Sequence, residues 1–318
     1  MTNKKYVFLF PGQGAQYPSM GIDFFDAFDE VKDLFARASE IMGRDMRKLI
    51  SEADAETLKR GDIAQPSITL VNLSAAAALK SRGVTPSACA GHSLGEYAAL
   101  AVCGVISAED SLRLTARRGE LMQKAAAAGG GMAAVIGLSS AEVEKALAEW
   151  TSAGHKDLYI ANLNSPRQTV VSGSSAALNE AEAWFKEAGA KRFIKLAVAG
   201  PFHCPLMTAA ADEFAAVLDS AAFSDPSIPF FSNVTGGQLM SGGEAKSLAL
   251  RQICGAVRWL DEETAIAASN PDAALEAGPG KALTGLWKDS GASAPCLPAG
   301  TLAGIDNINE WAKTVNPL

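Results

Sequence analysis

The sequence predicts an α/β protein with two parts: a large lobe built on a mostly parallel sheet flanked by helices, and a small ferredoxin-like lobe inserted into it. Short apolar runs alternate with segments of helical periodicity, which is typical of parallel sheets covered by helices. Residues 132–198 follow the order strand, helix, strand, strand, helix, strand. With 318 residues, 48% of them hydrophobic, the chain can bury one large core or the cores of two unequal lobes.

The elements of the large lobe begin with residues 6–10 (YVFLF), which predict a buried strand. Apolar side chains from 28 to 41 recur at helical spacing. A second helix is predicted from residue 68 to about residue 80, because Gly83 can end a helix in the left-handed conformation. Residues 87–90 predict a short strand, and residues 94–105 predict the helix that follows it.

The inserted lobe has strands predicted at 132–138, 157–163, 168–173 and 192–198, and helices predicted at 139–150 and 176–189. Ser139 and Glu142 have the spacing of a capping box at the start of the first of these helices. We therefore expect residues 1–130 and 199–318 to form the large α/β lobe, and residues 131–198 the inserted subdomain.

Composition excludes several classes of protein. The net charge of -7, without a run of basic residues among aromatic ones, argues against a nucleic-acid partner. Only five apolar residues lie between the two lysines at 4–5 and Pro11, too few for a signal peptide or a membrane span. We therefore expect a cytoplasmic location and no membrane partner. Five scattered cysteines without a C-x-x-C pair predict neither a disulfide framework nor a zinc site, and no other metal site is expected.

Residues 91–97, GHSLGEY, place Ser93 in the pattern Gly-x-Ser-x-Gly. A sharp strand-to-helix turn needs small residues on either side of an exposed serine nucleophile. In a chain with 29 glycines this pattern is expected by chance roughly 0.2 times, so it is weak evidence alone. The helix predicted after Ser93 would turn its positive end and its free N–H groups toward negative charge that develops there.

A serine nucleophile needs a base, and the chain has three histidines. His92 adjoins the serine, so its side chain should point away from the hydroxyl; His155 lies in a polar loop of the inserted lobe. His203 follows Gly-Pro-Phe directly after the inserted lobe, in a segment that predicts an irregular loop. This placement favours His203, although spacing alone leaves the other two, and a structural role for each, open.

Six motifs are spread along the chain: FPGQGAQ at 10–16, GHSLGEY at 91–97, ARRGELMQ at 116–123, GPFHCPLM at 200–207, QICGAVRW at 252–259 and EAGPGKALTGL at 276–286. Together they resemble the malonyl-CoA:acyl carrier protein transacylases, the stand-alone acyltransferases of type II fatty acid synthesis, which are similar to the acyltransferase domains of polyketide synthases. The resemblance runs along the whole chain in the family's order and implies an α/β-hydrolase-like core.

The resemblance implies a Ser-His dyad in which Ser93 is the nucleophile and His203 is the general base and later the general acid. The backbone carbonyl of Gln252 would orient the histidine in place of a carboxylate. Gln13 and the backbone N–H of Leu94 would form the oxyanion hole. Local reasoning leaves Gln13 a second role, in which it caps a helix or satisfies loop carbonyls.

The resemblance also implies the groups that contact substrate. Arg118 would bind the free carboxylate of malonyl with its planar fork of donors, whereas by itself Arg117-Arg118 is most simply a solvated pair on a helix. Phe202 would crowd a 2-methyl group, or be an ordinary core residue. Gln65 and Asn162 would line the pocket wall.

The activity implied is ping-pong transfer of malonyl from malonyl-CoA to the phosphopantetheine thiol of an acyl carrier protein, with the coenzyme A thioester as substrate and no bound cofactor. The carrier would be a transient, acidic partner of a monomer, and local basic residues such as Lys191 and Arg192 would meet it. The alternatives are a trans-acting polyketide synthase acyltransferase, a serine hydrolase or thioesterase, and a non-catalytic carrier-binding scaffold.

Overall fold

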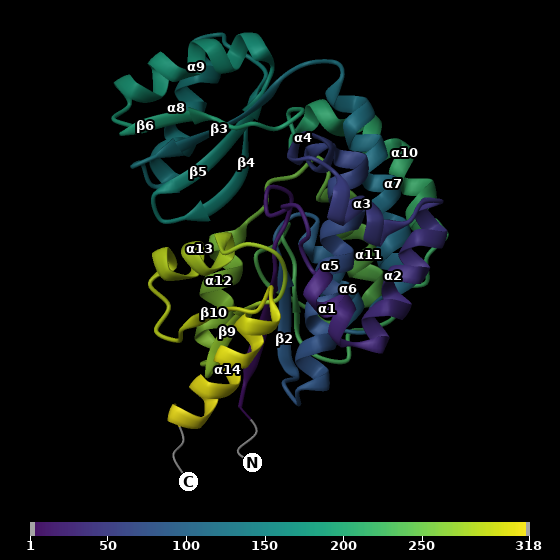
Figure 1. Ribbon diagram of the computed structural model, residues 1–318. Coiled ribbons are helices and arrows are strands. Elements are labelled where there is room, and N and C mark those ends of the chain that lie inside the picture. The colour runs from purple at the N-terminus through teal and green to yellow at the C-terminus, as the bar shows by residue number, and fades with distance from the viewer. Residues whose placement is uncertain (1–3, 316–318) are drawn as a thin grey trace.

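The computed structural model describes residues 4–315 and contains two sheets (Figure 1). The larger has the strand order β10-β9-β1-β2-β7-β8 and is parallel except for the pair β7–β8. The mostly parallel sheet predicted from the sequence is confirmed. Its strands are β1 (Tyr6–Phe10), β2 (Pro86–Gly91), β7 (Phe230–Phe231), β8 (Gln238–Leu239), β9 (Ala273–Glu276) and β10 (Cys296–Pro298).

Helices cover both faces of this sheet (Figure 1). The side chains of β1 alternate between two cores: Phe8 and Phe10 face the large one, and Val7 and Leu9 face a smaller one under α12 (Trp259–Ala268) and α13 (Ala282–Ser290). A strand that is buried on both faces has a continuously apolar sequence, and the sequence of β1 follows this pattern. The helices on the large core are α1 (Ile22–Ala27), α2 (Asp29–Met42), α3 (Met46–Glu52), α5 (Gly61–Ser81), α6 (Gly95–Val102), α7 (Ala108–Ala126), α10 (Thr208–Asp219), α11 (Gly242–Arg251) and α14 (Leu302–Val315). The short helix α4 (Ala55–Lys59) contacts α5.

The smaller sheet is antiparallel, with the strand order β4-β5-β3-β6. Its elements follow the predicted order: β3 (Gly131–Ile136), α8 (Ser140–Ser152), β4 (Leu158–Ser165), β5 (Gln168–Gly173), α9 (Ser175–Glu187) and β6 (Arg192–Lys195). Helices α8 and α9 bury Trp150 and Phe185 in a core of their own. The predicted capping box between Ser139 and Glu142 is present.

Strand β4 joins the small sheet to the large lobe through backbone hydrogen bonds. Leu163 N–H donates to the carbonyl of Val257 over 2.9 Å, and Val257 N–H donates to the carbonyl of Ala161 over 2.8 Å. The segment that carries Gln252 is thereby fixed against the small lobe, so both lobes contribute to the surroundings of the site.

Two helix boundaries differ from the prediction by three residues or more. Helix α5 begins at Gly61 rather than near residue 68, although Pro66 lies inside it. Nearly all of α5 is buried, and tertiary packing of this kind outweighs the intrinsic cost of one proline. Helix α6 ends at Val102, shortly before Gly104, whose φ of 77° leaves the helical region.

Candidate active site

Ser93 occupies a sharp turn between β2 and α6, and its φ of 52° lies in the left-handed region. The flanking glycines are required by close backbone approach. A Cβ on Gly91 would lie 2.1 Å from the carbonyl carbon of Gly95, and a Cβ on Gly95 would lie 2.0 Å from the carbonyl oxygen of Phe10. The Gly-x-Ser-x-Gly spacing therefore lets three backbone segments meet beside the serine at the carboxyl edge of the sheet.

The hydroxyl of Ser93 lies 2.7 Å from Nε2 of His203. On the other side of the ring, Nδ1 of His203 lies 2.8 Å from the backbone carbonyl oxygen of Gln252. A carbonyl oxygen can only accept, so Nδ1 carries the proton and Nε2 is free to accept from the serine hydroxyl. The structure thus brings Ser93, His203 and Gln252 together as expected, with a carbonyl in the place of a triad carboxylate.

The environment of His203 keeps its imidazole neutral. The side chain is 4% exposed, and burial together with the positive charge of Arg118 lowers its pKa to about 3. The hydrogen bond to Gln252 opposes this shift only in part. A neutral imidazole can accept a proton near neutral pH, which a general base must do.

Arg118 lies on α7 and is only 1% exposed. Its Nη1 donates to Oε1 of Gln65 over 2.7 Å, and its Nη2 donates to Oε1 of Gln252 over 2.9 Å. Nη2 also lies 3.3 Å from Oγ of Ser93. Nε has no partner within residues 4–315, and no carboxylate of that range forms an ion pair with the guanidinium. A buried cation held by neutral groups beside a nucleophile suits an anionic substrate group.

Close packing of α5 on α7 sets the direction of Arg118. A Cβ on Gly119 would lie 2.3 Å from the carbonyl oxygen of Gly61, so glycine lets the two helices touch there. Gln65, one turn after Gly61, is thereby brought to the guanidinium. The neighbouring Arg117 points to solvent, where it pairs with Glu120. The two adjacent arginines therefore have opposite environments.

A buried polar network that the sequence motifs did not predict lies behind the serine turn. Asn233 Oδ1 accepts from the Ser93 N–H over 2.7 Å, and Nε2 of Gln252 donates to the Ser93 carbonyl over 3.0 Å. Glu96 Oε2 accepts from the Asn233 N–H and from Gln252 Nε2, over 3.0 and 2.9 Å. Burial raises the pKa of Glu96 to about 7, against the effect of these donors and of Arg118. In the sequence Glu96 looks like an ordinary acid in the first turn of a helix.

The expected oxyanion groups lie around the same turn. Leu94 is the N-cap residue of α6, where N–H groups have no partner inside the helix. A Cβ on Gly12 would lie 2.5 Å from the carbonyl oxygen of His92, so the loop after β1 touches the turn. The side chain of Gln13 in this loop accepts from Gln65 Nε2 over 3.4 Å and donates to the Lys59 carbonyl over 3.5 Å.

Phe202 and Asn162 are 6% and 5% exposed. Phe202 belongs to the large core, and Asn162 lies on β4 where that strand bridges to Val257. Neither has a hydrogen bond or an aromatic contact with Ser93 or Arg118 in the described range.

The other two histidines have partners elsewhere. Nε2 of His92 lies 2.9 Å from Oδ1 of Asn164, and its ring contacts Trp259. Asn164, two residues after Asn162 on β4, was not singled out from the sequence. His155 stacks on Trp150 inside the small lobe, with 4.2 Å between ring centroids. His203 is therefore the histidine that the fold places on Ser93.

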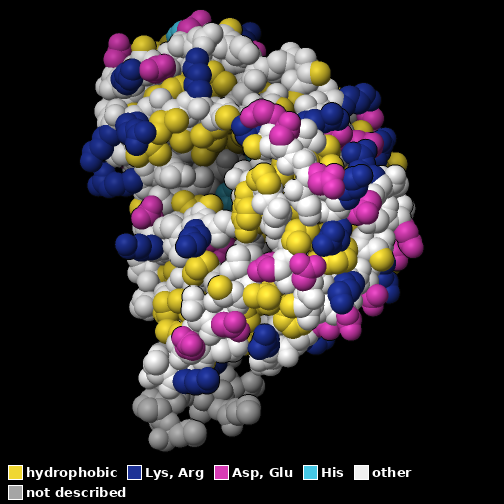
Figure 2. All heavy atoms as spheres, in the orientation of Figure 1, with side chains coloured by type: hydrophobic (Ala, Val, Ile, Leu, Met, Phe, Trp, Pro, Cys, Tyr) yellow, Lys and Arg dark blue, Asp and Glu magenta, His cyan; other side chains and the backbone are white. Residues whose placement is uncertain are grey.

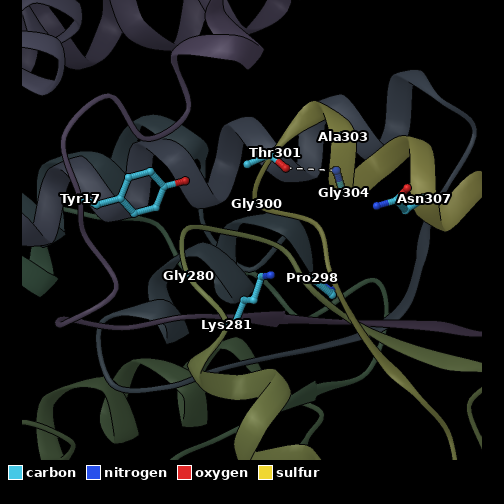
Figure 3. Close-up of a pocket in the computed structure, with 9 residues that line it drawn as sticks. All are labelled: Tyr17, Gly280, Lys281, Pro298, Gly300, Thr301, Ala303, Gly304 and Asn307. Carbon is cyan, nitrogen blue, oxygen red and sulfur yellow. Dashed lines mark hydrogen bonds between the residues drawn. The ribbon is translucent and has the colours of Figure 1, made fainter.

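Figure 2 shows a hollow between the lobe of the small sheet and the rest of the molecule, with a histidine side chain visible inside it and hydrophobic side chains along its upper rim. A separate surface cavity of about 380 Å³ lies beside the carboxyl ends of β9 and β10 (Figure 3). Tyr17, Lys281, Thr301 and Asn307 are among its lining residues, and Ser93 and Arg118 are not. This cavity is distinct from the candidate site.

Within residues 4–315 no three metal-binding side chains converge on one point. None of the helices in that range has the length and apolar character that crossing a bilayer requires. The five cysteines are all free.

An α/β fold that sets a serine against a histidine at the edge of a parallel sheet is typical of enzymes that move acyl groups. The model of one such family, described as the acyl transferase domain, matches residues 7–313. The chain belongs to this family.

Relatives and solved structures agree with this assignment. The chain is 39% identical over 290 residues to the malonyl CoA-acyl carrier protein transacylase of Escherichia coli, covering 89% of this chain and 92% of that one. It is 37% identical over 285 residues to the Bacillus subtilis protein of the same name, covering 89% and 90%. An acyl carrier protein S-malonyltransferase from Vibrio cholerae superposes with a TM-score of 0.91 at 36% identity, covering 96% and 99%. A malonyl-transacylase solved in complex with its type II polyketide synthase acyl carrier protein gives a TM-score of 0.90 at 34% identity, also covering 96% and 99%.

Proposed function

We propose that this protein transfers the malonyl group of malonyl-CoA to the phosphopantetheine thiol of an acyl carrier protein through a malonyl-serine intermediate. One observation carries the proposal: Oγ of Ser93 lies 2.7 Å from the base His203 and 3.3 Å from the buried guanidinium of Arg118. A nucleophile beside a fixed cation suits a short acyl group that ends in a carboxylate. The names of the relatives, malonyl CoA-acyl carrier protein transacylase, support the same substrates.

In the first half-reaction the hydroxyl of Ser93 attacks the thioester carbonyl while Nε2 of His203 takes its proton. The tetrahedral oxyanion accepts hydrogen bonds at Leu94 N–H and from Gln13, and each such donor is worth about a hundred- to a thousandfold in rate. The carbon–sulfur bond then breaks, and His203 returns the proton to the departing thiolate of coenzyme A. The Gln252 carbonyl stabilises the imidazolium in between.

In the second half-reaction the carrier's pantetheine thiol takes the place of coenzyme A. His203 accepts the thiol proton, the thiolate attacks the malonyl ester, and the ester carbon–oxygen bond breaks as the proton passes to Oγ of Ser93. Serine is regenerated and nothing is oxidised or reduced. The mechanism uses no metal or prosthetic group.

Arg118 accounts for selection of malonyl. The substrate carboxylate would pair with the guanidinium, whereas an acetyl group would leave that buried charge without an anion. Phe202 would limit space for a 2-methyl group, and Gln65 and Asn162 would complete the pocket wall. Gln65 has a further role in this account, since its Oε1 holds Nη1 of Arg118.

A polyketide carrier is the second candidate for the acceptor. Its support is the likeness to the malonyl-transacylase solved with a type II polyketide synthase carrier, and 38% identity to the polyketide biosynthesis protein ThaF of Burkholderia thailandensis, of whose length this chain covers 24%. The chemistry at Ser93 would be unchanged. A side-by-side transfer assay with a fatty acid carrier and a polyketide carrier separates the two candidates by their kcat/KM.

The remaining proposals concern organisation. We place the lobe boundaries at 130/131 and 198/199, and the first and last three residues of the chain lie outside the described range.

All groups used by the mechanism come from one chain, which supports a monomer acting on a transient carrier partner. A cytoplasmic location is proposed because the donor is a coenzyme A thioester, and five free cysteines suit a reducing compartment.

Steady-state transfer to a holo carrier protein tests this function, with the apo carrier, which lacks the thiol, as control. Parallel double-reciprocal plots and malonyl-holo-carrier as product are expected. Release of free malonate at the same rate with either carrier would instead show a hydrolase.

A further inference from the structure

The side-chain amide of Gln252 joins the parts of the site. Its Oε1 accepts from Arg118, while its Nε2 donates to the carbonyl of Ser93 and to Oε2 of Glu96. An amide oxygen can only accept and an amide nitrogen can only donate, so the orientation of this amide decides whether Arg118 meets an acceptor or another donor. The groups around Nε2 therefore control the carboxylate-binding side of the site.

Glu96 supplies the carboxyl acceptor among those groups. Nε2 of Gln252 lies 2.9 Å from Glu96 Oε2, 3.0 Å from the Ser93 carbonyl and 3.2 Å from Asn233 Oδ1. A carboxyl oxygen that bears no proton can accept but not donate, so this contact favours Nε2 of Gln252 over its Oε1. Glu96 is 1% exposed, so no water competes for this bond.

The carboxylate is itself fixed in position. It lies on α6 three residues after Ser93, and its Oε2 accepts a second hydrogen bond, from the backbone N–H of Asn233. Asn233 is oriented independently of Glu96, because its Oδ1 accepts from the Ser93 N–H and its Nδ2 donates to the Gly91 carbonyl and to Glu262. Glu96 is thus held by backbone and can hold the amide of Gln252 in turn.

We propose that Glu96 is a positioning residue for malonyl recognition: it fixes the Gln252 amide with Oε1 toward Arg118, and so keeps the guanidinium in place for the substrate carboxylate. The inference rests on the proposed function. Glu96 contacts no reacting atom, and its effect passes through Gln252. Replacing its carboxylate by an amide weakens the preference, because a glutamine at 96 can donate to Oε1 of a reversed Gln252 amide as well as accept from Nε2. Only the Ser93 carbonyl and Asn233 Oδ1 then oppose the reversal.

Glu96→Gln tests the proposal, with Glu263→Gln as the matched control. Glu263 is another fully buried carboxylate, but it accepts from Trp259 Nε1 and lies outside the Gln252 network. Two rates are measured for each variant: kcat/KM for malonyl transfer, and the rate at which phenylmethylsulfonyl fluoride labels Ser93. The sulfonyl fluoride carries no carboxylate, so its reaction reports the serine–histidine pair without the carboxylate-binding role of Arg118.

For Glu96→Gln we expect malonyl kcat/KM to fall about tenfold or more while labelling changes by less than about threefold. Glu263→Gln should leave the ratio of the two rates at the wild-type value. A purely structural role would lower both rates together, and that result, or an unchanged ratio in Glu96→Gln, overturns the proposal.

If Glu96→Gln does not fold, Glu96→Asp takes its place. The shorter side chain withdraws the carboxyl group from Nε2 of Gln252, so the same selective loss of malonyl transfer is expected. Equal loss of both rates would again overturn the inference. Absence of malonyl transfer by the wild type would count against the proposed function itself, which keeps the two failures distinct.

Discussion

Arg118 donates from Nη2 to Oε1 of Gln252 over 2.9 Å, although 134 positions separate the two residues. The backbone carbonyl of the same Gln252 accepts from Nδ1 of His203. One residue therefore orients both the base and the cation of the candidate site. The proposed chemistry and the proposed selectivity therefore both depend on Gln252.

Arg118→Lys should lower kcat/KM for malonyl-CoA about a hundredfold, because lysine offers a point charge in place of a planar fork held by Gln65 and Gln252. Arg117→Lys is the control, since that neighbour lies in solvent and pairs only with Glu120. Steady-state kinetics with a holo carrier measure both. Similar losses in the two variants would remove Arg118 from substrate binding.

The acid limb of the pH–rate profile should lie far below the ordinary histidine range. Burial and Arg118 lower the pKa of His203 from 6.5 to about 3, so the imidazole stays neutral as pH falls from 8 to 5. We expect protonation of His203 to lower kcat/KM for malonyl-CoA by less than about twofold over that pH range. A protonation step near pH 6.5 that is abolished with His203 would contradict the assigned environment.

The same shift affects stability. Because the folded-state pKa of His203 is depressed, its contribution to stability is present above pH 6.5 and is lost as pH falls toward about 3. His203→Gln should therefore lose less stability than the wild type between pH 6.5 and pH 4, measured by urea unfolding at each pH. An identical pH dependence in the two proteins would mean that the histidine titrates normally.

Gly95→Ala should destabilise the fold by about 3 kcal/mol or more, because its Cβ would lie 2.0 Å from the carbonyl oxygen of Phe10. Gly285→Ala in α13 is the control: nothing lies within 4 Å of its Cβ, so alanine should stabilise by about 0.5 to 1 kcal/mol. Chemical denaturation gives both values. A stable Gly95→Ala protein would refute the close approach at the serine turn.

Reversal of Lys191 and Arg192 to glutamate should raise the KM for the carrier about tenfold and leave the KM for malonyl-CoA unchanged. Arg192 begins β6, the edge strand of the small sheet, and Lys191 directly precedes it; both are exposed. Reversal of Lys145 and Lys186, on α8 and α9, makes the same change in net charge and serves as control. Equal effects of both double variants would show a general charge effect rather than docking.

Much of the fold could be predicted because each pattern there is local. The apolar run of β1 and the capped helices of the small lobe follow from spacing within a few residues. The start of α5 could not be predicted in this way, because it depends on the packing of Gly61 against Gly119, which lies far away in the sequence. Local rules treat that glycine, and Pro66 after it, as the end of a helix.

Some residues of the candidate site could likewise be predicted from the sequence, and others could not. Ser93 and His203 follow from motif and loop context, whereas local spacing alone treats Arg118 and its neighbour Arg117 as one solvated pair. Only contact between α5 and α7 turns Arg118 inward. Glu96 and Asn233 escaped notice because their hydrogen bond spans 137 positions and neither residue type stands out locally.

The most direct test of the account is intact-protein mass spectrometry after brief mixing with malonyl-CoA. We predict a malonyl adduct on the wild type that is absent from Ser93→Ala, does not form with acetyl-CoA, and discharges onto added holo carrier faster than onto water. An adduct that persists in Ser93→Ala, or one that passes to water as fast as to the carrier, would contradict transfer through Ser93.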